Sequence, residues 1–302
     1  MELSHQMLLI AVFLRKLFFE HYLNENMPPI ISIIVPCYNQ AKYMRDALDS
    51  VINSTLKEWE CVIVNDGSQD ETLSIAKEYE QKDNRFLVVD IPNGGLANAR
   101  NVGIRNSHGK YILPLDSDDK IGEKYLEYAV NYLETHSDTK LVYCLCHFFG
   151  DINGFRKLPD YSYQTILWQN VFFPACVYRR SDYDKTIGYN PNMKHGHEDW
   201  DFWLSLLSPN DKVYRIPDVQ FYYRKHGVSM IDGTIKRLSE TNRQLVLNHL
   251  DVYTPFLGDM IEWHNELLHY KGSYLALLKS PTYKLGHVLL SPLKWIRNIF
   301  SK

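Results

Sequence analysis

The sequence predicts an α/β fold in which helices cover a mostly parallel sheet. Three observations support this class. Short β-branched apolar runs alternate with stretches of helical periodicity between residues 30 and 150, and polar clusters directly follow several of these runs. The 302 residues are 45% hydrophobic and 23% charged, which is the composition of a globular protein. A disordered, fibrous or collagen-like chain is therefore excluded.

The elements up to residue 150 follow one another in strand–helix order. Residues 31–35 have the composition of a buried strand, a helix is expected over 40–53, and a second strand over 59–64. Ser68 and Glu71 predict a capping box at the start of the next helix. The rest of this part is expected to hold a helix to about residue 82, a strand over 86–89, a helix over 96–106, a strand over 111–115, a helix over 123–135 and a strand over 141–149.

After residue 150 the alternation stops, and tyrosine and tryptophan become frequent. A helix is expected over 198–207, followed by two strands over 212–216 and 219–223. From about residue 234 the pattern is helical to the end.

Polar clusters follow the first, second and fourth strands of this prediction. They are Tyr38-Asn39, Asp66-Gly67-Ser68 and Asp116-Ser117-Asp118-Asp119. Parallel sheets bind ligands beyond the carboxyl ends of their strands, so these clusters are expected to converge on one crevice.

The acidic cluster 116–119 places three carboxylates within four residues, where they repel one another unless they are solvated or neutralised. Mg²⁺ or Mn²⁺ neutralises such a group well, because both ions prefer hard oxygen ligands. A solvated acidic turn is the alternative. The position after a buried strand, at the ligand edge of the sheet, favours the cation.

Charge and cysteine content narrow the function further. The net charge is −3, so no basic field supports a nucleic-acid partner. The five cysteines are odd in number, and most of them lie in strand-like apolar runs. Free buried thiols in a reducing compartment are therefore expected rather than disulfides.

Six motifs in order resemble the inverting family 2 glycosyltransferases of bacterial envelope polysaccharide synthesis, which have the GT-A fold. The resemblance runs from about residue 31 to residue 230. The motifs are Val35-Pro36-Cys37-Tyr38-Asn39, Val64-Asn65-Asp66-Gly67-Ser68-Gln69-Asp70, the segment Gly95 to Gly103 that holds Ala99-Arg100-Asn101, Asp116-Ser117-Asp118-Asp119, Glu198-Asp199-Trp200 and Arg224-Lys225-His226-Gly227-Val228-Ser229.

The resemblance implies a nucleotide-sugar donor, with a UDP-sugar as the favoured one, and Mn²⁺ or Mg²⁺ as cofactor. Asp66 would accept a hydrogen bond from the base, and Asp118 would bind the metal. His226 would lie near the diphosphate as a second metal ligand or as a hydrogen-bond donor to a phosphate, with a structural histidine as the alternative. Arg100 would contact the negative end of the nucleotide. By this resemblance the other donor-binding residues are Pro36, Tyr38, Asn39, Gly67, Asp116, Ser117 and Arg224. Asp116 would contact the ribose, and Arg224 is a second candidate for binding a phosphate.

The same resemblance makes Asp199 the base that removes a proton from the acceptor hydroxyl. Asp199 lies in the first turn of the predicted 198–207 helix, where the helix dipole would keep a carboxylate ionised, and its ordinary pKa near ~4 is low for a base. Glu198 would position a loop or an acceptor hydroxyl. The alternative is that both acids only stabilise the helix N-terminus.

The predicted organisation has three parts. Residues 1–27 form an N-terminal helical extension, 28–230 form the catalytic domain, and 231–302 form a helical C-terminal region. Within the catalytic domain, 28–120 would bind the nucleotide and 121–230 the acceptor, which would be a glycan or a lipid-linked saccharide.

A membrane-surface helix is expected at the C-terminus. Leu289, Leu293, Ile296 and Phe300 form one apolar stripe, with basic residues beside it. Packing of this helix on its own domain is the alternative. The predicted location is the cytoplasm, at the inner face of the cytoplasmic membrane.

Three other functions fit the sequence less well. A haloacid-dehalogenase-type phosphatase also has an Asp-x-Asp motif, but after the first strand of its core rather than the fourth. A non-catalytic nucleotide-sugar-binding module is disfavoured by the presence of Asp118 and Asp199. A dinucleotide-binding dehydrogenase lacks support, because no Gly-x-Gly-x-x-Gly follows Val35.

Overall fold

A computed structural model describes residues 28–226 and 236–284, so the predicted N-terminal extension, the end of the sixth motif and the membrane-surface helix lie outside the described residues. The chain divides into two compact units between His249 and Leu250, and each is described by itself.

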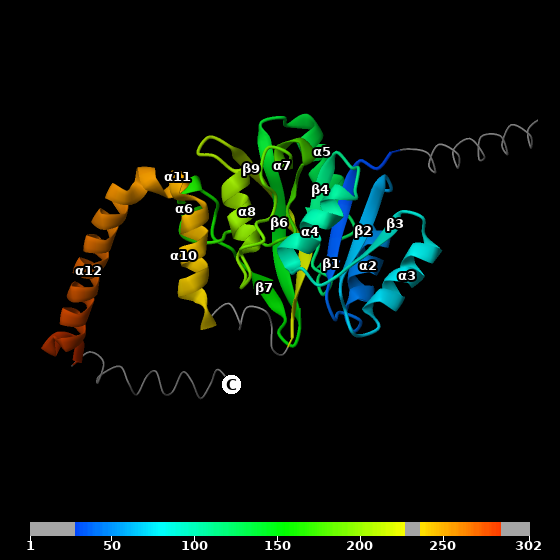
Figure 1. The fold of residues 1–302 in the computed structure, drawn as a ribbon. Helices are drawn as coiled ribbons and strands as arrows, with labels where there is room; N and C mark the ends of the chain where they lie inside the picture. Colours follow the sequence, from blue (N-terminus) through cyan, green and yellow to red (C-terminus); the bar gives the residue numbers. More distant parts are fainter. Residues whose placement is uncertain (1–27, 227–235, 285–302) are drawn as a thin grey trace, which may run out of the picture. The chain divides into compact units, whose positions relative to one another are not determined.

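The first unit alternates strands and helices as the sequence predicts (Figure 1). Its strands are β1 (Ile31–Cys37), β2 (Trp59–Asp66), β3 (Phe86–Ile91), β4 (Tyr111–Pro114), β5 (Lys120–Ile121), β6 (Thr139–Gly150), β7 (Gly154–Arg156), β8 (Val177–Arg179) and β9 (Lys212–Lys225). Its helices are α2 (Met44–Ile52), α3 (Thr72–Lys82), α4 (Leu96–Arg105), α5 (Tyr125–Thr135), α6 (Tyr163–Ile166), α7 (Arg180–Tyr183), α8 (Glu198–Leu206) and α10 (Leu238–Asn248).

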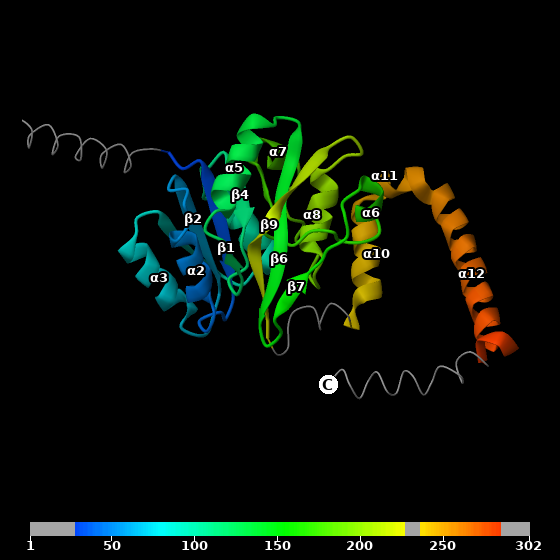
Figure 2. The same ribbon diagram turned by 180° about the vertical axis from the view of Figure 1, so that it is seen from behind.

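All nine of these strands belong to one mixed sheet, in which the path β3-β2-β1-β4-β8-β6-β9-β5 runs edge to edge and β7 pairs with β6. The predicted parallel part is confirmed, because β1, β2, β3 and β4 pair in parallel. The short strand β8 then joins β4 to β6 and is antiparallel to both. The long strands β6 and β9 run side by side in parallel (Figure 2).

Helices cover both faces of the sheet. On one face, apolar residues of α2, α3 and α5 form one core cluster with alternate residues of β1 such as Ile33 and Val35, which are fully buried. On the other face, α4 contacts β1 and β2 at Gly103, where an added Cβ would lie 2.4 Å from Ile34. The closeness of α4 to the sheet brings Arg100 of the same helix into the interior.

Three local predictions were wrong. The first helix begins at Met44, because Gln40 accepts hydrogen bonds from Tyr43 and Met44 in a preceding turn. Ser68 and Glu71 form no capping box, since the Ser68 hydroxyl accepts a hydrogen bond from the backbone of Asn39 instead. The two strands predicted over 212–223 are a single strand, β9, which passes Pro217 at a register shift against β6.

The five cysteines are all buried free thiols, as predicted. Burial raises the pKa of the Cys37 thiol to about 12, so this thiol stays protonated and unreactive at neutral pH.

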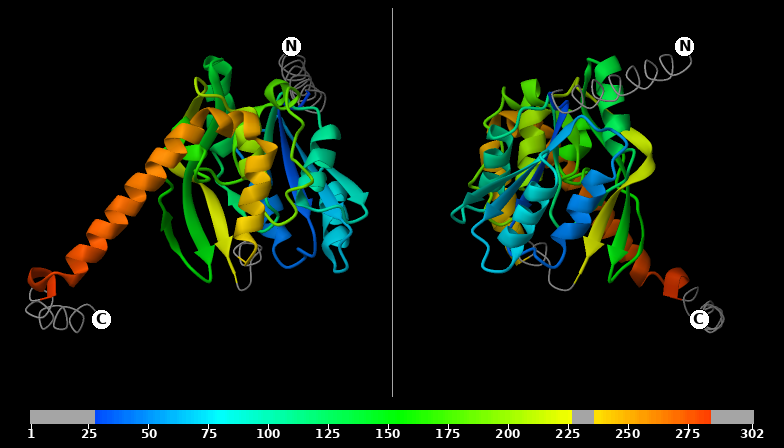
Figure 3. Two further views of the ribbon diagram at one scale, coloured as in Figure 1. Left: turned by 60° about the vertical axis from the view of Figure 1, so that its left-hand side comes forward. Right: turned by 90° about the vertical axis from the view of Figure 1, so that its right-hand side faces the viewer.

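The second unit is helical over its described residues, in agreement with the sequence. It contains α11 (Leu250–Tyr253), a 3₁₀ turn (Thr254–Phe256) and α12 (Leu257–Lys279), which is one continuous helix (Figure 3). Within 28–226 and 236–284, no helix combines the length and the apolar character needed to cross a bilayer.

Candidate active site

The carboxyl ends of β1 and β2 carry loops that are tied to each other. The two strands end level, with Cys37 opposite Asn65. Beyond them, the side chain of Asn39 accepts a hydrogen bond of 2.8 Å from the backbone N–H of Gln69, and its own N–H donates to the Ser68 hydroxyl at 3.0 Å. These two hydrogen bonds link the loops, and they hold the backbone of Asn39 in the left-handed region, with φ of 54°. Pro36 is buried within β1, whereas the Tyr38 ring is half exposed beside this junction.

Asp66 at the end of β2 holds the loop that leads into α4. Its two carboxylate oxygens accept hydrogen bonds from the backbone N–H groups of Gly94, at 2.7 Å, and Gly95, at 2.9 Å. Gly67 follows with φ of 70°, and a Cβ there would lie 2.8 Å from the backbone nitrogen of Asn93. Both residues of the Asp-Gly pair thus shape this loop. Asp66 is 3% exposed and both of its oxygens are engaged in this loop, so its predicted contact with a base N–H stays a prediction.

The acidic turn after β4 meets the end of β9. The Asp118 carboxylate lies 3.0 Å from Nε2 of His226, and the His226 ring stacks on Tyr43 with ring centroids 4.7 Å apart. Burial and the charge of Asp116 raise the pKa of Asp118. The two residues named from the sequence as metal ligands are therefore neighbours, although they come from positions 108 residues apart.

Asp119 and Arg224 fix this turn. The fully buried Asp119 accepts a hydrogen bond of 2.8 Å from the backbone N–H of Arg224, and the Arg224 side chain donates to the backbone oxygen of Asp118 at 2.7 Å. The guanidinium also pairs with Asp46 and lies over the ring of Phe149, 4.2 Å from its centroid. Arg224 is thus engaged with the protein, and direct phosphate binding would require it to leave these partners.

Asp119 and Asp46 were not assigned roles from the sequence. Asp119 has one buried carboxylate oxygen without a hydrogen-bond partner among the described residues. Burial and the charges of Asp118 and Asp116 raise its pKa well above the usual range of a carboxyl. Its place inside the acidic cluster was the signal for a role, whereas nothing in the sequence pointed to Asp46.

Arg100 forms a buried bridge between the acidic turn and α8. Its guanidinium is 0% exposed and donates to Asp116 at 2.6 Å and to Glu198 at 2.6 Å. Burial alone would lower the pKa of Arg100, but these two carboxylates outweigh that effect and raise it. The expectation that Arg100 faces the nucleotide needs correction, since both ends of its fork are engaged inside the protein. Glu198, expected to position a loop or an acceptor hydroxyl, instead holds Arg100, and Ser117 is buried within the turn.

Asp199 follows Glu198 in the first turn of α8. Its carboxylate accepts hydrogen bonds from the backbone N–H of Trp200 at 2.7 Å and from the side-chain amide of Asn170 at 2.9 Å. Burial, followed by the charge of Glu198, raises the pKa of Asp199 to about 7. The sequence-based expectation of a pKa near that of an ordinary carboxyl is therefore wrong, because desolvation outweighs the helix dipole. Asn170 is a site residue that the sequence did not reveal.

A buried contact also fixes the far side of α8. Asp201 is fully buried and accepts a hydrogen bond of 2.6 Å from Asn248, while Nε2 of His249 lies 3.1 Å from the same carboxylate. These contacts attach the end of α10 to the helix that carries Asp199. Compact packing of the first unit accordingly extends to His249, beyond the boundary at 230 that the sequence suggested.

Comparison with known proteins identifies the family. The family model for glycosyl transferase family 2 matches residues 32–197. RP339, named as an uncharacterized glycosyltransferase of Rickettsia prowazekii, is 30% identical over 257 residues, which are 81% of this chain and 76% of that protein. EpsJ of Bacillus subtilis, also named as an uncharacterized glycosyltransferase, is 42% identical over 239 residues, which are 72% of this chain and 67% of that protein. GgaB, a minor teichoic acid biosynthesis protein of B. subtilis, is 26% identical, but this chain spans only 29% of its length.

Solved structures share the fold. TarS of S. aureus, in a crystal structure of residues 1–349 with UDP, has a TM-score of 0.58 and 25% identity, covering 74% of this chain and 65% of that one. The mannosyltransferase PcManGT of Pyrobaculum calidifontis, in complex with GDP-Man and Mn²⁺, has a TM-score of 0.56 and 16% identity, covering 92% of this chain and 89% of that one. These likenesses confirm the GT-A architecture predicted from the motifs. With a family model that matches more than half of its residues, the chain belongs to glycosyltransferase family 2.

Proposed function

We propose that this glycosyltransferase moves a sugar from a nucleoside-diphosphate donor, UDP-linked in the favoured case, to a hydroxyl of a glycan or lipid-linked saccharide, with inversion at the anomeric carbon. The observation that carries the proposal is the ion-paired bridge from Asp116 through Arg100 to Glu198. It joins the acidic turn, where a diphosphate would lie, to the helix that presents Asp199. Donor and acceptor chemistry would therefore meet in one site.

The donor would lie along the carboxyl ends of β1, β2 and β4. The exposed Tyr38 ring offers a face for the base, and Asp66 offers lone pairs to a base N–H. Asp116, which keeps a quarter of its side chain exposed, would accept from a ribose hydroxyl. Complexes of TarS with UDP and with UDP-GlcNAc support a UDP-sugar for this fold.

The residues present fit a divalent cation. Asp118 and His226 offer an oxygen and a nitrogen ligand side by side, both about one quarter exposed. No cluster of three or more His, Cys, Asp or Glu side chains arranged for a metal occurs among the described residues, so donor oxygens would have to complete the coordination. Bound there, Mn²⁺ or Mg²⁺ would stabilise negative charge on the departing nucleoside diphosphate. The Mn²⁺ complex of PcManGT supports this reading.

Asp199 would take the proton from the acceptor hydroxyl as its oxygen attacks the anomeric carbon, and the bond from that carbon to the diphosphate would break on the opposite side. A base with a pKa near the working pH is suited to this step. The acidic turn follows β4, the fourth strand, which does not fit the phosphatase alternative. The similarity to GgaB supports a role in cell-surface polysaccharide synthesis.

Calorimetric titration with UDP tests the donor site. The parent protein should bind UDP more tightly with Mn²⁺ than without it, because Asp118 and His226 hold the ion beside the diphosphate. Asp118→Asn and His226→Ala should each remove the gain from Mn²⁺, while Asp184→Asn, at an exposed position, should retain it. Equal UDP affinity of the parent with and without Mn²⁺ would refute the metal assignment.

We also propose that the enzyme works at the inner face of the cytoplasmic membrane, where a lipid-linked acceptor would be found. The apolar stripe of residues 289–300, with basic residues beside it, supports this contact. Deleting residues 285–302 should shift the protein from the membrane fraction to the soluble fraction of cell lysates. If the deletion leaves the distribution between membrane and soluble fractions unchanged, this segment is not the anchor. The full-length protein with Lys284→Ala is the control for altered expression.

A further inference from the structure

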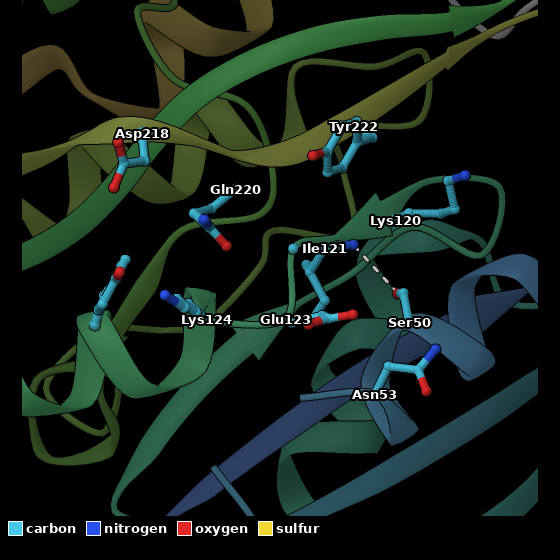
Figure 4. A pocket seen from close by; sticks show the side chains of 11 residues that line it. Ser50, Asn53, Lys120, Ile121, Glu123, Lys124, Asp218, Gln220 and Tyr222 are labelled. Carbon is cyan, nitrogen blue, oxygen red and sulfur yellow. Dashed lines mark hydrogen bonds between the residues drawn. The ribbon is translucent and has the colours of Figure 1, made fainter. Parts of the chain in front are cut away.

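Large apolar side chains are exposed along α12 of the second unit. A pocket of about 550 Å³ in the first unit, where β5 pairs with β9, has a polar lining with charges of both signs, such as Lys124 and Asp218, and indicates no particular ligand (Figure 4). On α12, in contrast, seven large apolar side chains between Ile261 and Leu277 are each at least 45% exposed. Exposed apolar surface gathered in this way marks an interaction site.

One row of these side chains has the spacing of a coiled-coil seam. Leu267, Tyr270, Tyr274 and Leu277 follow one another at steps of three, four and three residues, and they are 54–69% exposed. Trp263, which is half-buried, continues the row four residues earlier. Apolar residues at alternating steps of three and four are the positions through which two helices interlock in a coiled coil. We call the row from Trp263 to Leu277 the α12 seam.

A second exposed row on α12 does not have this spacing. Ile261, Leu268 and Leu275 recur only every seven residues, and the positions three residues after the first two hold His264 and Lys271. At 3.6 residues per turn, this row lies about 130° around the helix from the centre of the α12 seam. The α12 seam is therefore the row with the uninterrupted apolar pattern, and the second row would stay outside a helix pair formed through it.

The charges beside the α12 seam select the partner and its orientation. Asp259 and Glu266 lie on one flank of the seam, whereas His264 and Lys271 lie on the other. In a parallel pair of identical helices, each acid would lie beside the base five residues further along the other helix, Glu266 beside Lys271 and Asp259 beside His264. In an antiparallel pair, acids would face acids and bases would face bases. The flanks are thus complementary to a second copy of this chain in parallel.

Within one copy these charges are not used. Glu266 and Lys271 point about 140° apart around the helix, so they cannot reach each other. Over residues 28–226 and 236–284, the side chains of Asp259, Glu266 and Lys271 form no hydrogen bond or ion pair. A lipid surface fits them less well, because helices that lie on membranes carry Lys and Arg on their polar face, whereas Asp259, Glu262 and Glu266 are acidic.

The geometry points to self-association of this chain through α12, as a parallel two-stranded coiled coil in which the α12 seams of two copies interlock. The seam spans only about 21 Å at 1.5 Å per residue, so the association is weak and depends on protein concentration. It does not depend on the proposed reaction. Its use does rest on the proposed function: the C-terminal ends of both α12 helices would lie together, so that two chains would make the proposed membrane contact at once.

Sedimentation velocity of the full chain, at concentrations between about 1 and 300 µM, tests the inference. The parent should show a monomer–dimer equilibrium. Leu267→Glu should abolish the dimer over this range, because it places two carboxylates against each other within the seam. Leu268→Glu is the matched control: the neighbouring leucine is also exposed, but it lies in the second row, so its replacement should leave the equilibrium unchanged.

A charge exchange tests the parallel orientation without altering the apolar seam. Glu266→Lys and Lys271→Glu should each weaken the dimer about tenfold, because two symmetry-related pairs turn from attraction to repulsion. The variant with both substitutions should regain the parent affinity, since its pairs are complementary again. Neither residue has a partner within its own copy, so the helix itself should be unaffected, and circular dichroism would verify this.

Three results would overturn the inference. They are a parent chain that stays monomeric at every concentration, equal effects of Leu267→Glu and Leu268→Glu, and a double charge exchange that does not regain affinity. UDP binding with and without Mn²⁺, measured on the same samples, separates the two proposals. If UDP binding lacks the Mn²⁺ dependence while the dimer persists, the metal-assisted transfer proposal fails and the self-association stands.

Discussion

Replacing Asp199 by Asn is expected to lower kcat by about 10²–10⁴-fold while leaving the affinity for UDP with Mn²⁺ unchanged. Asn cannot accept the proton from the acceptor hydroxyl, and Asp199 does not belong to the acidic turn, which is joined to α8 through Arg100 and Glu198. Rates of UDP release with a matched sugar donor and acceptor, combined with calorimetric UDP binding, would measure the two effects separately. Transfer at near the parent rate would show that another group is the base.

A change in the stability of Asp199→Asn is not expected to account for its lower kcat. The pKa of Asp199 is raised to about 7, above its value of ~3.9 in an unfolded chain, so the folded state binds the proton more tightly. The free energy of unfolding therefore falls as the pH rises from about 4 to 7, and Asn removes this penalty at neutral pH. The substitution also removes the carboxylate that accepts a hydrogen bond from Asn170, and this loss lowers the free energy of unfolding. The two effects oppose each other, so the net change in the free energy of unfolding should be small. Thermal unfolding of the variant and of Asp184→Asn, a surface control, would verify this.

The same pKa sets the expected pH profile. A general base acts in its deprotonated form, so kcat of the parent should rise roughly tenfold between about pH 6 and pH 8 and level off above. Glu198 raises and Arg100 lowers the pKa of Asp199, and both lie beside it. The residual activity of Asp199→Asn should lose this limb of the profile. A parent profile that is flat between pH 6 and pH 8 would contradict the role of Asp199 as the titrating base.

The sequence predicted the parallel half of the sheet because β1, β2 and β4 are mostly apolar runs that are buried on both faces. The runs at β1 and β2 end at polar loops, and the pairing of parallel strands brought those loops together as expected. The other half was less predictable. β8 has only three residues, and its antiparallel insertion between β4 and β6 depends on tertiary contacts. The sequence predicted two strands, over 212–216 and 219–223, but β9 continues past Pro217 because the ladder with β6 absorbs the irregularity in a register shift.

Within the site, motifs located the residues but did not reveal their partners. Asp118 and His226, which the motifs assigned to the metal, lie 3.0 Å apart, and their role as metal ligands stays a prediction. The bridge of Arg100 to Glu198 joins residues 98 positions apart, and no local pattern indicates such a contact. Asn170, whose amide holds Asp199, lies in a segment without motif or periodicity. Burial decides the pKa of Asp199, and burial follows from packing that a linear pattern does not contain.

Replacing Arg100 by Met is expected to lower the free energy of unfolding by about 3–5 kcal/mol, because it leaves the buried Glu198 carboxylate and the partly buried Asp116 carboxylate without their shared cation. The matched control is Arg45→Met, which breaks the Arg45–Glu78 pair, at 2.8 Å and with both side chains more than 40% exposed. Pairs of that kind contribute at most about 1 kcal/mol. Chemical denaturation of both variants would measure the difference.

A second variant shows whether the loss comes from unpaired charge. Adding Glu198→Gln to Arg100→Met removes one of the two uncompensated carboxylates, so the double variant should recover part of the lost stability. It should not recover transfer, because Arg100 and Glu198 together connect the acidic turn to α8 and so set the position of Asp199 relative to the donor. A loss of stability in Arg100→Met no greater than in Arg45→Met would mean that the bridge is solvated in solution, and the coupling of the two halves of the site would then need another structural basis.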